Sequence, residues 1–256
     1  MSILAINGFD IEYRLIESPT QSDLTLVVLH EGLGSTAMWR DFPERLGQAV
    51  GAKVLVYSRM GYGLSTPLSA DRDVDYMHEE ARRSLPAVLD RLNIRNPVLF
   101  GHSDGASIAL IHAAEPESTA RAVIALAPHV KVEDISVASI ERIKVAFETT
   151  DLRERLARYH ANVESAFWGW NRIWLNPAFR SWNIEHLLPA IRCPVLAIQG
   201  WQDEYGTMEQ IASVARFVPR SQTLALADCR HSPHRDQAEA VIQATSKFVD
   251  QLSVAP

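Results

Sequence analysis

The sequence has few cysteines and no long hydrophobic run. Only two of its 256 residues are cysteines, Cys193 and Cys229, too few for a disulfide framework, so we expect two buried, reduced thiols. The longest apolar runs, such as residues 24–29, have the length of a strand and not the roughly 20 residues that cross a bilayer. The first residues lack the basic stretch and apolar core of a signal peptide. We therefore expect a cytoplasmic protein without stable membrane association.

The sequence also has no large excess of either positive or negative charge. The net charge is −6, which gives no sign of the strongly basic face that nucleic-acid binding requires. No group of histidines and carboxylates has the spacing of metal ligands, so we expect no metal site and no cofactor. Apolar residues make up 47% of the chain, enough for the core of one large globular domain. The sequence leaves the oligomeric state open.

The chain does contain alternating strand-like and helix-like segments. Short β-branched runs are each followed by a helical pattern, while residues 9–16 alternate apolar and polar side chains and predict an antiparallel edge strand. This order is typical of an α/β fold with a mostly parallel central sheet and helices on both faces. The predicted parallel strands cover residues 24–29, 54–57, 98–100, 123–126, 195–199 and 223–226.

One long segment interrupts the alternation. Residues 133–188 contain no strand-like run and are rich in aromatic side chains. Because a structureless loop of this length is rare in a compact domain, we predict a helical insertion over the sheet, with residues 1–132 and 189–256 as the core. Most aromatics at helical spacing pack a core, and some line apolar sites. We expect one or two of Trp168, Trp170 and Trp174 at the substrate site.

The segment around Ser103 predicts a nucleophile. Gly101-His102-Ser103-Asp104-Gly105 follows a strand-like run and precedes a helical one, which is the G-x-S-x-G pattern of a nucleophile elbow. The strained turn leaves no room for side chains two residues before and after the serine, so glycine is needed at both positions. The alternative is an ordinary strand–helix turn with a serine cap.

His231 is the predicted general base. A serine hydroxyl needs a base to take its proton, and with this elbow the base follows the last strand. His231 lies just after residues 223–226. His234 is the competitor, but Pro233 beside it and a helix expected to begin near Asp236 indicate that His234 caps the helix or is exposed.

Asp203 is the predicted acid. It lies in the loop after residues 195–199, where a carboxylate can orient the imidazole and stabilise its charged form. We expect the adjacent Glu204 to be solvated. The alternative acid lies one strand earlier, at Glu133 or Asp134.

The oxyanion formed during acyl transfer needs two hydrogen-bond donors. One is the backbone N–H of Asp104, directly after the nucleophile. The other is predicted in the loop of residues 30–35, whose glycines allow the backbone to approach a substrate closely.

With these residues the chain resembles the α/β-hydrolase family over nearly its whole length. Residues 29–35 look like the histidine-glycine oxyanion loop of the family, and residues 57–65 look like its arginine-glycine-x-glycine-x-serine turn. The resemblance implies that Gly32 is the second oxyanion donor and that 133–188 is the lid. Two residues depart from the family pattern: Glu31 stands where glycine is usual, and Arg230 replaces a common glycine before the base.

These features predict a serine hydrolase of the carboxylesterase or thioesterase type. We expect it to cleave an ester or thioester of a small apolar or aromatic acyl group through an acyl-enzyme, with Glu31 and the lid tryptophans as candidate substrate-binding residues. Fold alone does not determine the substrate. The alternatives are a carbon–carbon bond hydrolase of aromatic degradation, an amino-acid ester hydrolase and a non-catalytic ligand receptor.

The side chain of Asp104 has two interpretations. Serine followed by aspartate and glycine resembles the elbow of biphenyl-hydrolase-like enzymes, in which the carboxylate binds the amine of an amino-acid ester. Alternatively, the carboxylate only interacts favourably with the positive end of the helix dipole.

Overall fold

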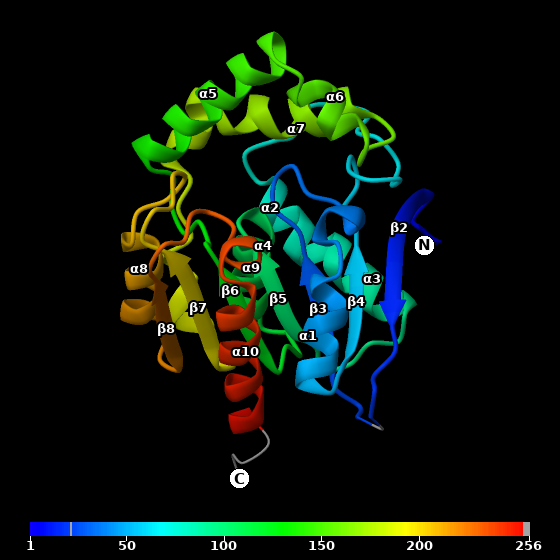
Figure 1. Ribbon diagram of the computed structural model, residues 1–256, viewed down its shortest axis with the longest axis vertical. Coiled ribbons are helices and arrows are strands. Elements are labelled where there is room, and N and C mark those ends of the chain that lie inside the picture. Colours follow the sequence, from blue (N-terminus) through cyan, green and yellow to red (C-terminus); the bar gives the residue numbers. More distant parts are fainter. Residues whose placement is uncertain (21, 253–256) are drawn as a thin grey trace.

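The central sheet has eight strands in the order β1-β2-β4-β3-β5-β6-β7-β8 (Figure 1). The structure is a computed structural model that describes residues 1–20 and 22–252. β1 and β2 form an antiparallel hairpin at one edge, β2 is antiparallel to β4, and the other neighbours are parallel. The strands are β1 (Ser2–Ile6), β2 (Phe9–Ile16), β3 (Thr25–Leu29), β4 (Lys53–Tyr57), β5 (Val98–His102), β6 (Ala122–Leu126), β7 (Val195–Gly200) and β8 (Ser221–Leu226).

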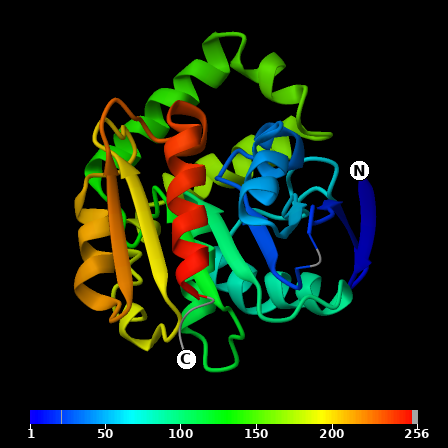
Figure 2. The same cartoon turned by 60° about the horizontal axis from the view of Figure 1, so that its bottom comes forward.

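Helices cover both faces of this sheet, which confirms the predicted α/β fold. One face packs against α1 and α10 (Figure 2), and the other against α3, α4 and α8. Every residue of β3, β5, β6 and β7 is therefore buried, which explains their continuous apolar sequences. The helices of the core are α1 (Phe42–Val50), α2 (Tyr76–Glu79), a π-helical turn (Glu80–Ser84), α3 (Leu85–Arg91), α4 (Asp104–Ala114), α8 (Glu209–Phe217), α9 (Pro233–Asp236) and α10 (Ala238–Leu252).

Three helices form a further layer over the carboxyl ends of the parallel strands (Figure 1). They are α5 (Asp134–Thr149), α6 (Leu152–Ala157) and α7 (Val163–Trp174), which follow β6 and precede β7 in the chain. Phe147 of α5 stacks on Phe167 of α7 with their ring centroids 3.7 Å apart, so this layer has an aromatic core of its own. We refer to α5, α6 and α7 as the lid. Among the described residues, no helix is both long and apolar enough to span a bilayer.

The register of the strands brings several loops to one place. Leu29 at the end of β3 pairs with Gly101 of β5, and Gly200 at the end of β7 pairs with Leu226 of β8. Because these strands are parallel, the loops that follow them leave from the same edge of the sheet. The candidate residues in those loops therefore meet beneath the lid.

Candidate active site

Ser103 occupies the sharp turn between β5 and α4. Its backbone angles, φ 53° and ψ −119°, lie in a region that side-chain-bearing residues rarely adopt. A Cβ at Gly101 would overlap the backbone of Gly105, and a Cβ at Gly105 would overlap the carbonyl oxygen of Leu29. Gly101 is thus required by the turn itself, and Gly105 is required by the neighbouring strand β3.

Ser103, His231 and Asp203 lie in one hydrogen-bonded chain. The Ser103 Oγ atom is 3.0 Å from His231 Nε2, and His231 Nδ1 is 2.8 Å from Asp203 Oδ1. The same carboxylate oxygen accepts hydrogen bonds from the backbone N–H groups of Tyr205 and Gly206, at 2.8 and 3.2 Å. The acid is therefore held in place by its own loop.

The charges of His231 and Asp203 stabilise each other. Burial by itself would lower the pKa of His231 and raise that of Asp203, but their mutual attraction and hydrogen bond outweigh burial. The pKa of His231 is consequently above its ordinary value, and that of Asp203 is below. An ionised Asp203 can stabilise the imidazolium that forms when His231 takes a proton from Ser103.

The two predicted oxyanion donors have no other use in the fold. Among the described residues, the backbone N–H groups of Gly32 and Asp104 have no hydrogen-bond partner. The loop that carries Gly32 is fixed by Arg59, whose backbone N–H donates to His30 Nε2 at 3.0 Å and whose Nη2 donates to the carbonyl oxygen of Glu31 at 3.2 Å. This arrangement leaves two backbone donors free, one of them on the residue next to Ser103.

The alternative acids after β6 are engaged elsewhere. Glu133 accepts hydrogen bonds from Thr207 and Gln210, and Asp134 pairs with Arg180. In the described structure neither carboxylate contacts His231. The structure thus brings together the residues that the sequence favoured.

The expectation that His234 is exposed was wrong. His234 is buried, not exposed, and its ring packs 4.5 Å from Trp39 and 5.6 Å from Phe42 between ring centroids. Glu204 is also not simply solvated, since it accepts from the backbone N–H of His231 at 3.2 Å and pairs with Arg230 at 3.1 Å. The loop after β8 folds back on the core, which its polar sequence did not indicate.

The Asp104 carboxylate faces protein groups that sequence reasoning missed. It is fully buried and accepts a hydrogen bond from the Tyr76 hydroxyl at 2.7 Å, which in turn accepts from Trp174 Nε1 at 3.1 Å. Arg59, itself buried, lies 3.9 Å away. Burial raises the pKa of Asp104, and the Arg59 charge partly opposes this. Arg59 is thus a buried counter-ion for the Asp104 carboxylate.

Glu31 also interacts with the protein itself. Its carboxylate lies 3.4 Å from His102 Nδ1 and 3.4 Å from Arg235 Nη2. Although burial opposes its ionisation, the hydrogen bond from His102 and the nearby positive charges hold the pKa of Glu31 well below its ordinary value. The departure from glycine at this position therefore links the loop after β3 to the elbow and to α9.

The three lid tryptophans lie in different surroundings. Trp170 contacts Gly32, because a Cβ added to that glycine would overlap the indole ring. Trp174 packs against His129, with ring centroids 4.9 Å apart. Trp168 does not join them: its contacts are with other lid residues, including a hydrogen bond to Glu164. Positions 170 and 174 are about one helical turn apart, whereas 168 falls on the opposite face of α7.

Two further rings surround His231 without having been predicted. Tyr205 lies 4.6 Å and His129 5.7 Å from the His231 ring, measured between centroids. Burial, together with the charge of His231, lowers the pKa of His129 to about 3, so this ring is neutral. The only sequence signal for these two rings was their position, since each follows a strand that ends at the same edge of the sheet as β5.

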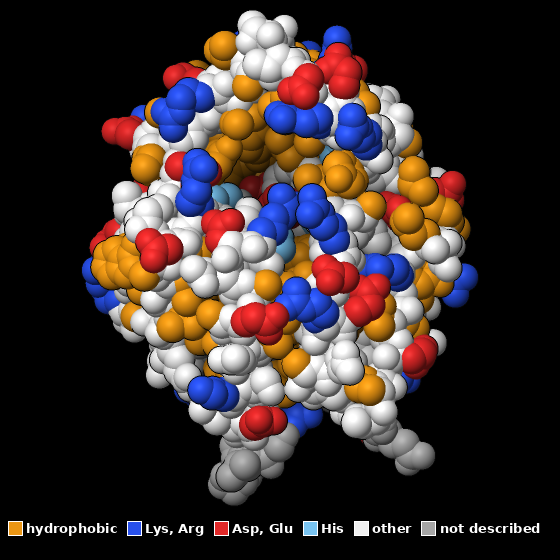
Figure 3. Space-filling model, in the orientation of Figure 1, with side chains coloured by type: hydrophobic (Ala, Val, Ile, Leu, Met, Phe, Trp, Pro, Cys, Tyr) orange, Lys and Arg blue, Asp and Glu red, His pale blue; other side chains and the backbone are white. Residues whose placement is uncertain are grey.

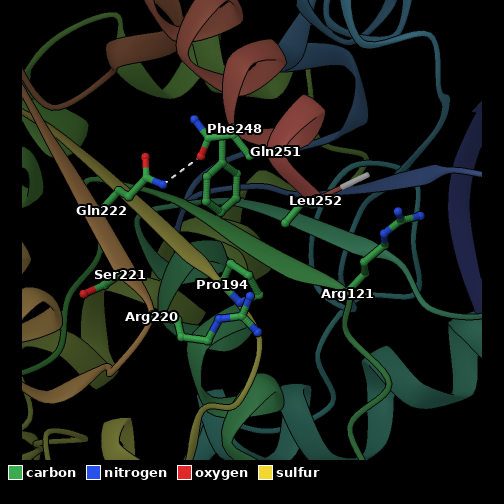
Figure 4. Close-up of a pocket in the computed structure, with 8 residues that line it drawn as sticks. All are labelled: Arg121, Pro194, Arg220, Ser221, Gln222, Phe248, Gln251 and Leu252. Carbon is green, nitrogen blue, oxygen red and sulfur yellow. Dashed lines mark hydrogen bonds between the residues drawn. The ribbon is translucent and has the colours of Figure 1, made fainter. Parts of the chain in front are cut away.

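A hollow lies at the surface between the lid and the core. Figure 3 shows that it is lined with hydrophobic side chains and bordered by lysine or arginine side chains. A separate pocket lies at the opposite end of the sheet, where Arg121, Arg220 and Phe248 surround the amino ends of β6, β7 and β8 (Figure 4). That pocket contains none of the candidate residues.

Comparison with known proteins identifies the family of this chain. A sequence profile described as "Alpha/beta hydrolase family" matches residues 26–244. The chain belongs to the alpha/beta hydrolase family. An enol-lactonase structure from Burkholderia xenovorans superposes with a TM-score of 0.78 and 19% identity, covering 97% of this chain and 100% of that one. A proline iminopeptidase structure from Mycobacterium smegmatis superposes with a TM-score of 0.81 and 17% identity, covering 99% of this chain and 98% of that one. At these identities the likeness shows the shared fold.

Curated relatives of this hydrolase differ in activity. Proline iminopeptidase of Lactobacillus helveticus is 29% identical over 105 residues. This match covers 41% of this chain and only 35% of the length of that relative. N-formylmaleamate deformylase of Pseudomonas putida is 25% identical over 241 residues and 88% of both chains. The human serine hydrolase BPHL is 23% identical, over 96% of this chain and 85% of its own.

Proposed function

We propose that this hydrolase uses Ser103 to cleave a carboxylic ester or thioester of a small apolar or aromatic acyl group. The observation that carries the proposal is the chain of hydrogen bonds from Asp203 through His231 to Ser103 Oγ. His231 takes the Ser103 proton while Oγ attacks the carbonyl carbon, and then delivers that proton to the leaving alcohol or thiol. Water, activated by the same base, releases the acid from the acyl-enzyme.

The surroundings of Ser103 support this choice of substrate. The N–H groups of Gly32 and Asp104 are available to the oxyanion, and the indole ring of Trp170 in the lid lies against Gly32 as an apolar wall. An ammonium group on the substrate is disfavoured, because the Asp104 carboxylate is directed to Tyr76 and Arg59.

A substrate panel with a covalent probe tests the proposal. Wild type should hydrolyse p-nitrophenyl esters of short acids and react with a fluorophosphonate, whereas Ser103→Ala should lose about 10³-fold or more of kcat and all labelling. Acyl-CoA thioesters and an amino-acid ester complete the panel, together with an enol-lactone and N-formylmaleamate, because an enol-lactonase and an N-formylmaleamate deformylase are among the similar proteins. Equal labelling of wild type and Ser103→Ala would contradict the assignment of the nucleophile.

A further inference from the structure

The N–H groups of the lid tryptophans are used differently. Trp168 Nε1 donates to Glu164 at 2.9 Å, and Trp174 Nε1 donates to the Tyr76 hydroxyl at 3.1 Å. The Trp170 N–H has no partner among the described residues. Indole nitrogen is a donor only, so this group can be satisfied only by water or by an oxygen of a ligand.

The Trp170 N–H lies directly on the loop that carries a proposed oxyanion donor. A Cβ on Gly32 would overlap both the indole nitrogen and the adjacent Cδ1, so this edge of the ring contacts the Gly32 backbone. The side chain is only 7% exposed. Its N–H is nevertheless not enclosed, in contrast to that of Trp182, which is buried without a partner. The free donor can therefore be reached by water or by a bound ligand.

We propose that the Trp170 N–H is a third donor to the substrate oxygen held by the N–H groups of Gly32 and Asp104. This inference rests on the function proposed above. An alkoxide oxygen can accept several hydrogen bonds, and its charge is largest in the transition state, so a fixed donor contributes more there than to the bound substrate. The indole keeps its proton throughout.

One consequence concerns which substrates are accepted. The Gly32 and Asp104 donors belong to the core, whereas Trp170 belongs to α7 of the lid. The complete set of three donors exists only while the lid rests on the loop after β3. Esters whose acyl groups fit beneath the closed lid should therefore react faster than bulkier esters that hold α7 away.

A pair of matched substitutions tests the role of the donor. Trp170→Phe keeps an apolar ring but removes the N–H, and Trp168→Phe makes the same change at a tryptophan outside the site. With p-nitrophenyl acetate, Trp170→Phe should lower kcat by about 10- to 100-fold with little change in KM. Affinity for a trifluoromethyl ketone, which forms an oxyanion with Ser103, should fall by a similar factor. Trp168→Phe should leave both values near those of wild type.

The outcomes separate this inference from the proposed function. If Trp170→Phe retains the kcat and the ketone affinity of wild type while Ser103→Ala is inactive, the third donor is refuted and the hydrolase proposal stands. If wild type neither turns over esters nor reacts with the fluorophosphonate, the hydrolase proposal itself fails. Should Trp170→Phe not fold, replacing Trp170 by 3-benzothienylalanine keeps the bicyclic shape without the N–H, and wild-type kcat in that variant would overturn the inference.

Discussion

The Nε2 atom of His102 lies 2.7 Å from the backbone carbonyl oxygen of His231. A carbonyl oxygen only accepts, so Nε2 carries a proton and donates it to this contact. The other ring nitrogen, Nδ1, lies 3.4 Å from the Glu31 carboxylate. One buried ring thus connects the elbow, the loop of the proposed base and the loop of the proposed oxyanion donor.

We expect His102 to act as a positioning residue for His231. His102→Leu removes the donor to the His231 carbonyl and should lower kcat/KM by about 10-fold, the effect of one lost hydrogen bond. His102→Gln keeps an N–H donor on the side chain and should retain more activity than the leucine variant. Steady-state assays of both variants, with circular dichroism to check folding, make the comparison. Equal activities in the two variants would refute a role for the hydrogen bond.

The pH dependence of hydrolysis should reflect His231. A base must be neutral to accept the Ser103 proton, so kcat/KM should rise with pH through the pKa of this histidine. Because Asp203 raises that pKa above its ordinary value of 6.5, the midpoint should lie on the alkaline side of 6.5. Asp203→Asn should cut kcat by about 10⁴-fold and move the midpoint of the remaining activity to lower pH. An unmoved midpoint would argue against Asp203 as the partner of His231.

Gly32 should be intolerant of even one added methyl group. Gly32→Ala places a Cβ on the Trp170 indole, and overpacking of this kind costs about 1–3 kcal/mol. Trp170→Ala vacates the same space, so the double variant should be more stable than the sum of the two single changes predicts. Chemical denaturation of all four proteins measures this coupling. Strict additivity would show that the lid does not rest on Gly32 in solution.

Asp104→Asn tests the two interpretations of that carboxylate. The substitution leaves the buried Arg59 charge without its partner, and the structure therefore predicts a loss of about 3 kcal/mol in the free energy of unfolding, in place of the 0.3–1 kcal/mol expected for a helix-dipole interaction alone. The activity ratio between an amino-acid ester and a neutral ester should stay at its wild-type value. A wild-type preference for the amino-acid ester that disappears in Asp104→Asn would instead identify the carboxylate as an amine site.

Acid should destabilise the protein through His129. Its pKa is about 3 in the folded chain and near 6.5 in the unfolded chain, so between these values the unfolded state binds the additional proton. Stability is therefore fully present above pH 6.5 and declines as the pH falls, by about 2 kcal/mol from this residue at pH 5. In His129→Phe the difference in unfolding free energy between pH 7 and pH 5 should shrink by that amount. An unchanged difference, measured by urea titration, would contradict the assignment.

Much of this hydrolase could be predicted from the sequence because the governing demands are local. The buried parallel strands show as continuous apolar runs, and the elbow shows as two glycines around Ser103. The order of serine, acid and histidine along the chain is the one typical of folds with this elbow, and parallel strands bring the three loops to one edge of the sheet. These features need no knowledge of contacts between distant residues.

Other features were decided only by tertiary structure. His231 and His234 are three residues apart, and the choice between them depends on the packing of the second ring against Trp39 and Phe42. Trp168 and Trp170 are distinguished by the rotation of α7 relative to the core. The Asp104 carboxylate interacts with Arg59, which is distant in the chain. Periodicity shows which residues share a face, but the partner of that face is selected by the packing of the whole domain.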